Sequence, residues 1–192
     1  MWPWEHAAVG YVLYSLLSRA TAREPPGDLP TVAVLIGTQL PDLVDKPLSW
    51  GLGVFQTGYA AGHSVLLAVP VGIAIAALSI RARKQAIGAG LVVGYWSHVV
   101  GDFLNPLRYG DGPSFDAVLW PVIVAPAYEQ DLGLGRGLLY FGDLFASLQS
   151  VDSLSVLVAY FFVPLVAATV WLVDGAPGVA IVGRLGRQLQ PE

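Results

Sequence analysis

The decisive stretch of this chain is Gly94-Tyr95-Trp96-Ser97-His98-Val99-Val100-Gly101-Asp102-Phe103-Leu104, the end of an apolar run that begins at Ala86. His98 and Asp102 are four residues apart, a spacing that places both side chains on one face of a helix, about 6 Å apart along its axis. An imidazole and a carboxylate on one helical face can bind a metal ion, as paired histidines do in helical zinc sites. The alternative is a His–Asp hydrogen bond that only ties the helix.

The composition predicts an integral membrane protein. Of the 192 residues, 55% are hydrophobic and 12% are charged, and the mean hydropathy is +0.60. A soluble globular domain has roughly twice that charged fraction. The chain has no cysteine, so thiolate metal sites and disulfides are excluded. A net charge of −4 argues against nucleic acid as a partner.

Five apolar runs predict an all-α, polytopic membrane helix bundle of about five hydrophobic helices. They are Trp4 to Leu17, Thr31 to Leu43, Val65 to Ile80, Ala86 to Leu104 and Leu154 to Val173. The second run is shorter than the roughly 20 residues of a spanning helix, so whether it crosses fully stays open. Residues 105–152, rich in Gly, Pro, Asp and aromatic side chains, are expected to form an extramembrane insert. The whole chain, 1–192, is read as one integral membrane domain.

Basic residues predict the orientation in the membrane. Seven of the ten lie in three clusters that follow the first, third and fifth runs: Arg19 and Arg23; Arg81, Arg83 and Lys84; Arg184 and Arg187. Short loops rich in Lys and Arg face the cytoplasm. The chain would then cross five times in the cell membrane, with residues 105–152 on the extracytoplasmic side.

This topology brings the candidate ligands to one membrane level. All three histidines of the chain, together with the carboxylates embedded in apolar sequence, fall at the extracytoplasmic ends of the runs: His6, Asp42, Asp45, His63, His98 and Asp102. Ionisable groups in membrane segments cost about 2.5–3.5 kcal/mol each, and a divalent cation would compensate them. Imidazole and carboxylate ligands favour zinc, with other divalent ions open, and six candidates could hold one ion or two.

These motifs together resemble a known family, the YdjM-like membrane-bound, predicted metal-dependent hydrolases. The resemblance covers roughly residues 1–125 and rests on His6, the Pro41-Asp42 turn, His63-Ser64 before an apolar helix, Gly94-Tyr95 through His98 and Asp102, and Leu119-Trp120-Pro121. It implies a metal-dependent hydrolase. The spacing of His98 and Asp102 also faintly resembles zinc-dependent phospholipase C, which implies phosphoester hydrolysis.

Two functions are therefore expected. In the first, an enzyme hydrolyses a lipid or phosphoester, with His6, Asp42, His63, His98 and Asp102 as metal ligands and Asp45 as a further ligand or the general base. In the second, a non-catalytic membrane protein uses the cluster for structure or for ion or proton passage. Membrane lipid is the expected partner in the first case.

Overall fold

A computed structural model describes residues 1–149 and 153–181 of the chain, and within these ranges the secondary structure is helical without a strand. The α-helices are α1 (Pro3–Thr21), α2 (Asp28–Gly37), α3 (Leu40–Lys46), α4 (Val65–Arg81), α5 (Gln85–Leu104), α6 (Gly135–Leu148) and α7 (Ser153–Val173). Two short helices of other types, Pro47–Gly51 and Asn105–Tyr109, follow α3 and α5. The predicted all-α class is confirmed.

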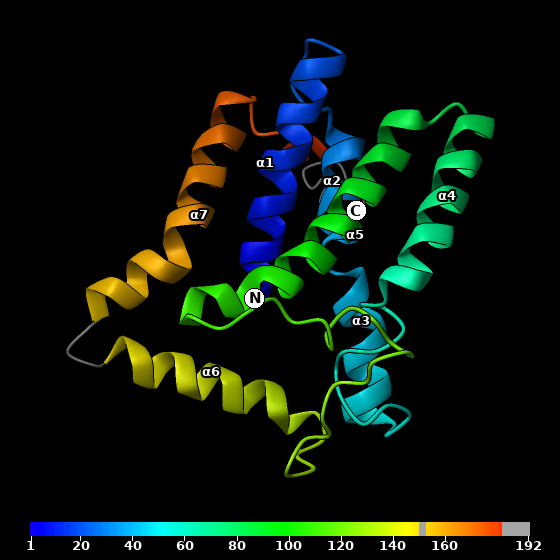
Figure 1. Cartoon of the computed structure of the whole chain (residues 1–192). Coiled ribbons are helices and arrows are strands. Elements are labelled where there is room, and N and C mark those ends of the chain that lie inside the picture. Colours follow the sequence, from blue (N-terminus) through cyan, green and yellow to red (C-terminus); the bar gives the residue numbers. More distant parts are fainter. Residues whose placement is uncertain (150–152, 182–192) are drawn as a thin grey trace, which may run out of the picture.

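The longer helices run between two ends of the molecule, and α6 lies across one of them (Figure 1). The end of α1, the link from α4 to α5 and the end of α7 lie at the opposite end from α6. Two of the three basic clusters therefore share one end of the fold, as the sequence predicted. The third, Arg184 and Arg187, lies outside the described residues.

Among the described residues, one helical segment has both the length and the hydropathy needed to cross a membrane, Gln85–Tyr109. Val65–Arg81 and Tyr160–Val173 are apolar but shorter. The structure therefore confirms the helical class, and the five membrane crossings stay a prediction.

The second apolar run is not one continuous helix, as the prediction over Thr31 to Leu43 had it. It breaks after Gly37 and resumes at Leu40, giving α2 and α3. Pro41 lies in the first turn of α3, where its missing N–H costs no helical hydrogen bond. The break leaves the Thr38 carbonyl without its helical donor, and this carbonyl becomes part of the site.

Glycines let α2 and α5 pack with their backbones in contact. A Cβ atom on Gly94 would stand 2.3 Å from the Val34 carbonyl oxygen, and one on Gly37 would stand 2.5 Å from that of Leu91. Small residues at helix interfaces allow this approach in membrane proteins. Because His98 lies one turn beyond Gly94, the same packing brings its ring to the break after α2.

Candidate metal centre

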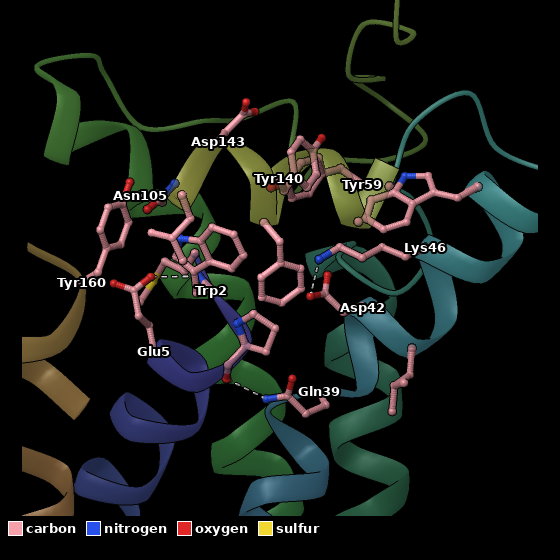
Figure 2. A pocket seen from close by; sticks show the side chains of 18 of the residues that line it. Trp2, Glu5, Gln39, Asp42, Lys46, Tyr59, Asn105, Tyr140, Asp143 and Tyr160 are labelled. Carbon is pink, nitrogen blue, oxygen red and sulfur yellow. Dashed lines mark hydrogen bonds and ion pairs between the residues drawn. The ribbon is translucent and has the colours of Figure 1, made fainter. Parts of the chain in front are cut away.

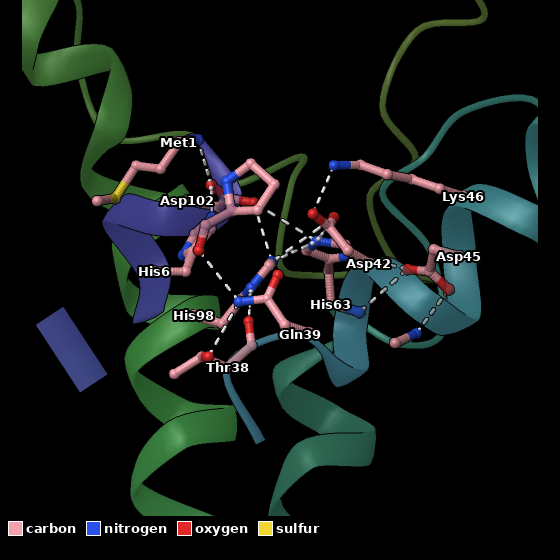
Figure 3. Close-up of polar contacts among 12 residues, drawn as sticks. Met1, His6, Thr38, Gln39, Asp42, Asp45, Lys46, His63, His98 and Asp102 are labelled. Carbon is pink, nitrogen blue, oxygen red and sulfur yellow. Dashed lines mark hydrogen bonds and ion pairs between the residues drawn. The ribbon is translucent and has the colours of Figure 1, made fainter. Parts of the chain in front are cut away.

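Four side chains from three parts of the chain meet at the end of the bundle nearer α6 (Figure 3). Asp42 lies in the first turn of α3, His63 just ahead of α4, and His98 and Asp102 on α5. All four are buried, and one ligand atom from each lies within 4.8 Å of all the others. The group could hold a metal ion.

The separations between these atoms are those of neighbouring ligands around one ion. His63 Nε2 lies 3.1 Å from His98 Nε2, 3.4 Å from Asp42 Oδ1 and 3.5 Å from Asp102 Oδ2. His98 Nε2 lies 3.7 Å from Asp42 Oδ1 and 3.4 Å from Asp102 Oδ2. In a tetrahedral site with bonds of about 2.0–2.2 Å, neighbouring ligand atoms stand roughly 3.3–3.6 Å apart.

Hydrogen bonds fix both imidazole rings with Nε2 toward the centre. His98 Nδ1 lies 2.6 Å from the Thr38 carbonyl oxygen, which can only accept, so Nδ1 carries the proton. His63 Nδ1 lies 2.8 Å from Asp45 Oδ2 and donates to it in the same way. Partners of this kind orient metal-binding histidines and leave Nε2 free to ligate.

Two Nε2 atoms at 3.1 Å, facing two carboxylate oxygens, need positive charge between them. Without a metal, a proton has to supply it: burial lowers the pKa of His63, but the neighbouring carboxylates of Asp102, Asp42 and Asp45 outweigh burial and raise that pKa to about 10. A divalent cation would satisfy all four atoms at once.

Asp42 gives a second indication that a cation fits. Its Oδ2 accepts a hydrogen bond of 2.5 Å from Lys46 Nζ, whereas its Oδ1 is buried without a hydrogen-bond partner among the described residues. An orphaned carboxylate oxygen aimed at two imidazole nitrogens is costly unless a cation occupies the space.

His6 lies beside the group of four rather than in it. Its ring stacks on that of His98 with centroids 3.6 Å apart, and its Nε2 is 3.2 Å from Asp102 Oδ1. Both His6 ring nitrogens are buried and lack a hydrogen-bond partner within the described part of the chain.

Asp45 is placed behind His63. Besides the His63 ring, it accepts hydrogen bonds from three backbone N–H groups, those of Ala60 at 2.7 Å, Gly62 at 2.8 Å and His63 at 3.1 Å. With both oxygens occupied and the side chain fully buried, Asp45 orients His63. The general-base role raised from the sequence has no support in this geometry.

Two participants were missed by the sequence analysis. The Thr38 carbonyl had no side-chain signal, although the Pro41 that follows the break was visible. Lys46 was not among the candidate site residues, yet it pairs with Asp42, four residues earlier on α3. The i, i+4 spacing of Asp42 and Lys46 on one helix could have indicated that pair.

A cavity of about 720 Å³ borders the candidate metal cluster, the group of Asp42, His63, His98 and Asp102, at its Asp42 side chain (Figure 2). Asp42 and Lys46 lie in its wall, together with Tyr59 and residues from the start of α1 and from α6. Of the four candidate ligands, Asp42 therefore borders a space large enough for a small molecule, and the other three do not line it.

The fold and site define a helical protein with a buried His/Asp cluster fit for a metal. The chain matches the model of the YdjM inner membrane protein family over residues 1–175 and belongs to that family. The family resemblance read from the motifs is confirmed, and so is a membrane location. No curated protein and no solved structure matches the chain.

Proposed function

We propose that this chain is a membrane-bound, metal-dependent hydrolase whose ion, zinc, is held by Asp42, His63, His98 and Asp102. The observation that carries the proposal is the convergence of two imidazole nitrogens and two carboxylate oxygens beside a cavity. The nitrogens lie 3.1–3.7 Å from each other and from the oxygens, and all four atoms lie within 4.8 Å of one another. Imidazole and carboxylate donors without thiolate suit zinc, and the four-atom group supports one ion.

When bound, the ion supplies Lewis acidity to an ester and makes water more acidic. The chain itself positions the side chains that would bind the ion. Asp45 and the Thr38 carbonyl hold the two imidazoles in the metal-binding tautomer, and Lys46 holds Asp42 at the cavity wall. Hydrolysis of a lipid or phosphoester at the membrane surface is the reaction that this arrangement supports, with membrane lipid as its partner.

Metal analysis of the purified protein, followed by a hydrolysis panel, tests the proposal. About one zinc per chain is expected, and His98→Ala should lose most of it because a ligand and a helix contact disappear together. The panel comprises bis-p-nitrophenyl phosphate, p-nitrophenyl phosphate and p-nitrophenyl butyrate. Zinc-dependent turnover of a phosphoester supports the hydrolase, and full zinc retention by His98→Ala would overturn the site.

A second function is favoured by the ligand count. Four protein ligands close a tetrahedral zinc site, as in structural zinc centres, whereas catalytic sites keep one position open. A non-catalytic metal-binding protein would carry zinc and lose it in His98→Ala, yet would hydrolyse none of the three esters. The panel therefore separates the two functions.

A further inference from the structure

The cavity beside the metal cluster is much larger than a phosphate group needs. Its volume of about 720 Å³ lies within the roughly 300–1,000 Å³ of small-molecule sites. Figure 2 shows Asp42 and Lys46 on one side of it and Trp2 and Tyr160 on the other. A ligand that fills this space must extend well beyond a group held at the metal.

Most of the cavity wall away from Asp42 and Lys46 is formed by aromatic and apolar side chains. Trp2 packs on Phe141 of α6 with ring centroids 5.2 Å apart, and Trp50 packs on Tyr140 at 6.0 Å. These contacts hold the rings in place from both sides of the cavity. A preformed apolar wall rewards a ligand with an apolar portion.

The charges near the cluster favour a negative group. A divalent cation would balance the charges of Asp42 and Asp102, which leaves the Lys46 ammonium, 2.5 Å from Asp42 Oδ2, as an uncompensated positive charge in the cavity wall. Two further cations lie in the wall: the Met1 amino group, 2.7 Å from Asp102 Oδ1, and Arg108, whose guanidinium lies 2.7 Å from Glu5 Oε1. Asp45 does not line the cavity. Asp143 of α6 does line it, as an exposed residue.

Helix α6 gives the apolar portion a route to the bilayer. It lines the cavity with Tyr140 and Leu144, while Leu138 and Phe145 are 77% and 63% exposed. A helix with an apolar exposed face, lying across the end of a membrane bundle, suits the membrane interface (Figure 1).

From these observations we infer that the cavity binds a phosphate-bearing amphiphile, with the phosphate between the metal and Lys46 and the hydrocarbon chain along the aromatic wall beneath α6. This deepens the proposed function and rests on it for the metal. A lipid headgroup and a soluble phosphoester both carry a phosphate. The aromatic wall, which would bind a hydrocarbon chain, favours the lipid over the soluble phosphoester.

Three probes of matched structure test this in the zinc-loaded, full-length protein in maltoside detergent, by titration calorimetry. They are hexylphosphonate, methylphosphonate with the same head but no chain, and hexyltrimethylammonium with the same chain but opposite charge. Hexylphosphonate should bind at least tenfold more tightly than either of the others. If methylphosphonate binds as tightly as hexylphosphonate, the ligand is a soluble phosphoester and not a lipid. If hexyltrimethylammonium binds as tightly, the cavity does not select an anionic ligand and the proposal is overturned.

Two variants test where the phosphonate head and the hydrocarbon chain of the probe bind. In protein kept saturated with zinc, Lys46→Gln should weaken hexylphosphonate at least tenfold, and Lys84→Gln, an exposed lysine at the other end of the fold, is its control. Gly137→Leu, which places a side chain in the cavity wall, should weaken hexylphosphonate but leave methylphosphonate unchanged. Gly142→Leu, on α6 with no atom within 4 Å of a built Cβ, is the matched control.

The binding result is independent of turnover, because a phosphonate is not hydrolysed. Tight, chain-dependent phosphonate binding without ester hydrolysis would remove the hydrolase and keep the cavity assignment. The opposite outcome is also possible to detect. If the protein hydrolyses a phosphoester but Lys46→Gln and Gly137→Leu leave phosphonate binding unchanged, the hydrolase is kept and the cavity assignment is removed.

Discussion

At the scale of single residues, the candidate site depends on groups that would not touch a bound ion. Asp45 accepts four hydrogen bonds, one of them from the ring of His63. Asp45→Asn keeps the shape but replaces one acceptor oxygen with a donor, so His63 loses its fixed orientation. Partners of this kind change metal affinity by about 10–100-fold. We therefore expect zinc affinity to fall by that factor while the protein still folds.

The measurement is competitive zinc titration against a chromogenic chelator, with circular dichroism to verify the helical content. Asp111→Asn, an exposed carboxylate outside the site, should leave zinc affinity unchanged. Wild-type zinc affinity in Asp45→Asn would contradict the positioning role.

The candidate ligands were visible in the sequence because ionisable side chains are rare in its apolar runs. Three histidines and a few carboxylates interrupt apolar runs, and the i, i+4 pair of His98 and Asp102 identifies the helix that carries two of them. Which atoms face the centre was not visible. The roles of Asp45 and His6 are set by the conformation of the loop before His63 and by ring stacking on His98, and neither has a periodic signature.

At the scale of elements, the packing of α2 on α5 sets the position of His98. A methyl group on Gly94 would meet the Val34 carbonyl oxygen at 2.3 Å and the Thr38 nitrogen at 2.9 Å. These are backbone atoms, so no side-chain rotation relieves the clash, and overpacking costs about 1–3 kcal/mol. Gly94→Ala should therefore lower both thermal stability and zinc content.

Gly142→Ala is the control for Gly94→Ala, because space around Gly142 is open. Melting curves and zinc content of the two variants are compared in one detergent. If Gly94→Ala matched the control in both measurements, the close helix contact would play no part in building the site.

Helix positions were predictable because apolar runs in a membrane protein correspond directly to helices. The structure extends the predicted fourth run by one residue at its start, to Gln85, and the fifth by one, to Ser153. The break between α2 and α3 was not predicted, since a proline in a first helical turn is compatible with both a break and a continuous kinked helix. Helix α6 lies within residues 105–152, the expected extramembrane insert, and its bounds were not predicted because Gly and polar residues interrupt its short apolar pattern.

At the scale of the whole molecule, two hydrogen bonds and an ion pair join α1 to the residue that follows α7, at the end away from the candidate metal site. Asp174, just after α7, accepts hydrogen bonds of 2.7 Å from both Tyr11 and Ser15 on α1, and it pairs with Arg19. Burial raises the pKa of Asp174, but these hydrogen bonds and Arg19 outweigh burial, so the pKa lies below its ordinary value.

A carboxyl group whose pKa is lowered by folding stabilises the fold above its unfolded pKa and loses that contribution as the pH falls through the folded pKa. Asp174→Asn should therefore lower stability near pH 7, by about 1–3 kcal/mol for the weakened buried hydrogen bonds. The difference from wild type should shrink as the pH falls below about 4. Thermal melts at pH 7, 5 and 3.5 measure it, and a difference that stays constant across this range would exclude the carboxylate charge as the cause.

The orientation of the whole molecule decides from which side of the membrane a ligand could reach the candidate metal site. The metal cluster and α6 share one end of the fold, and the basic residues Arg19, Arg23, Arg81, Arg83 and Lys84 lie toward the other (Figure 1). Lys and Arg in short loops mark the cytoplasmic side. We therefore predict that the cluster and the cavity face the extracytoplasmic side, so that a substrate arrives from the outer leaflet.

Single cysteines test this prediction, because the natural chain has none. Ser49→Cys follows α3, Gly112→Cys lies in the open loop after α5, and Gln85→Cys is exposed at the start of α5. An impermeant thiol reagent added to intact cells should label the first two and spare the third, which should react only after the cells are permeabilised. Labelling of Gln85→Cys alone would reverse the orientation. Labelling of only one of Ser49→Cys and Gly112→Cys would place the α3 and α5 ligands on opposite sides, which a shared metal site forbids.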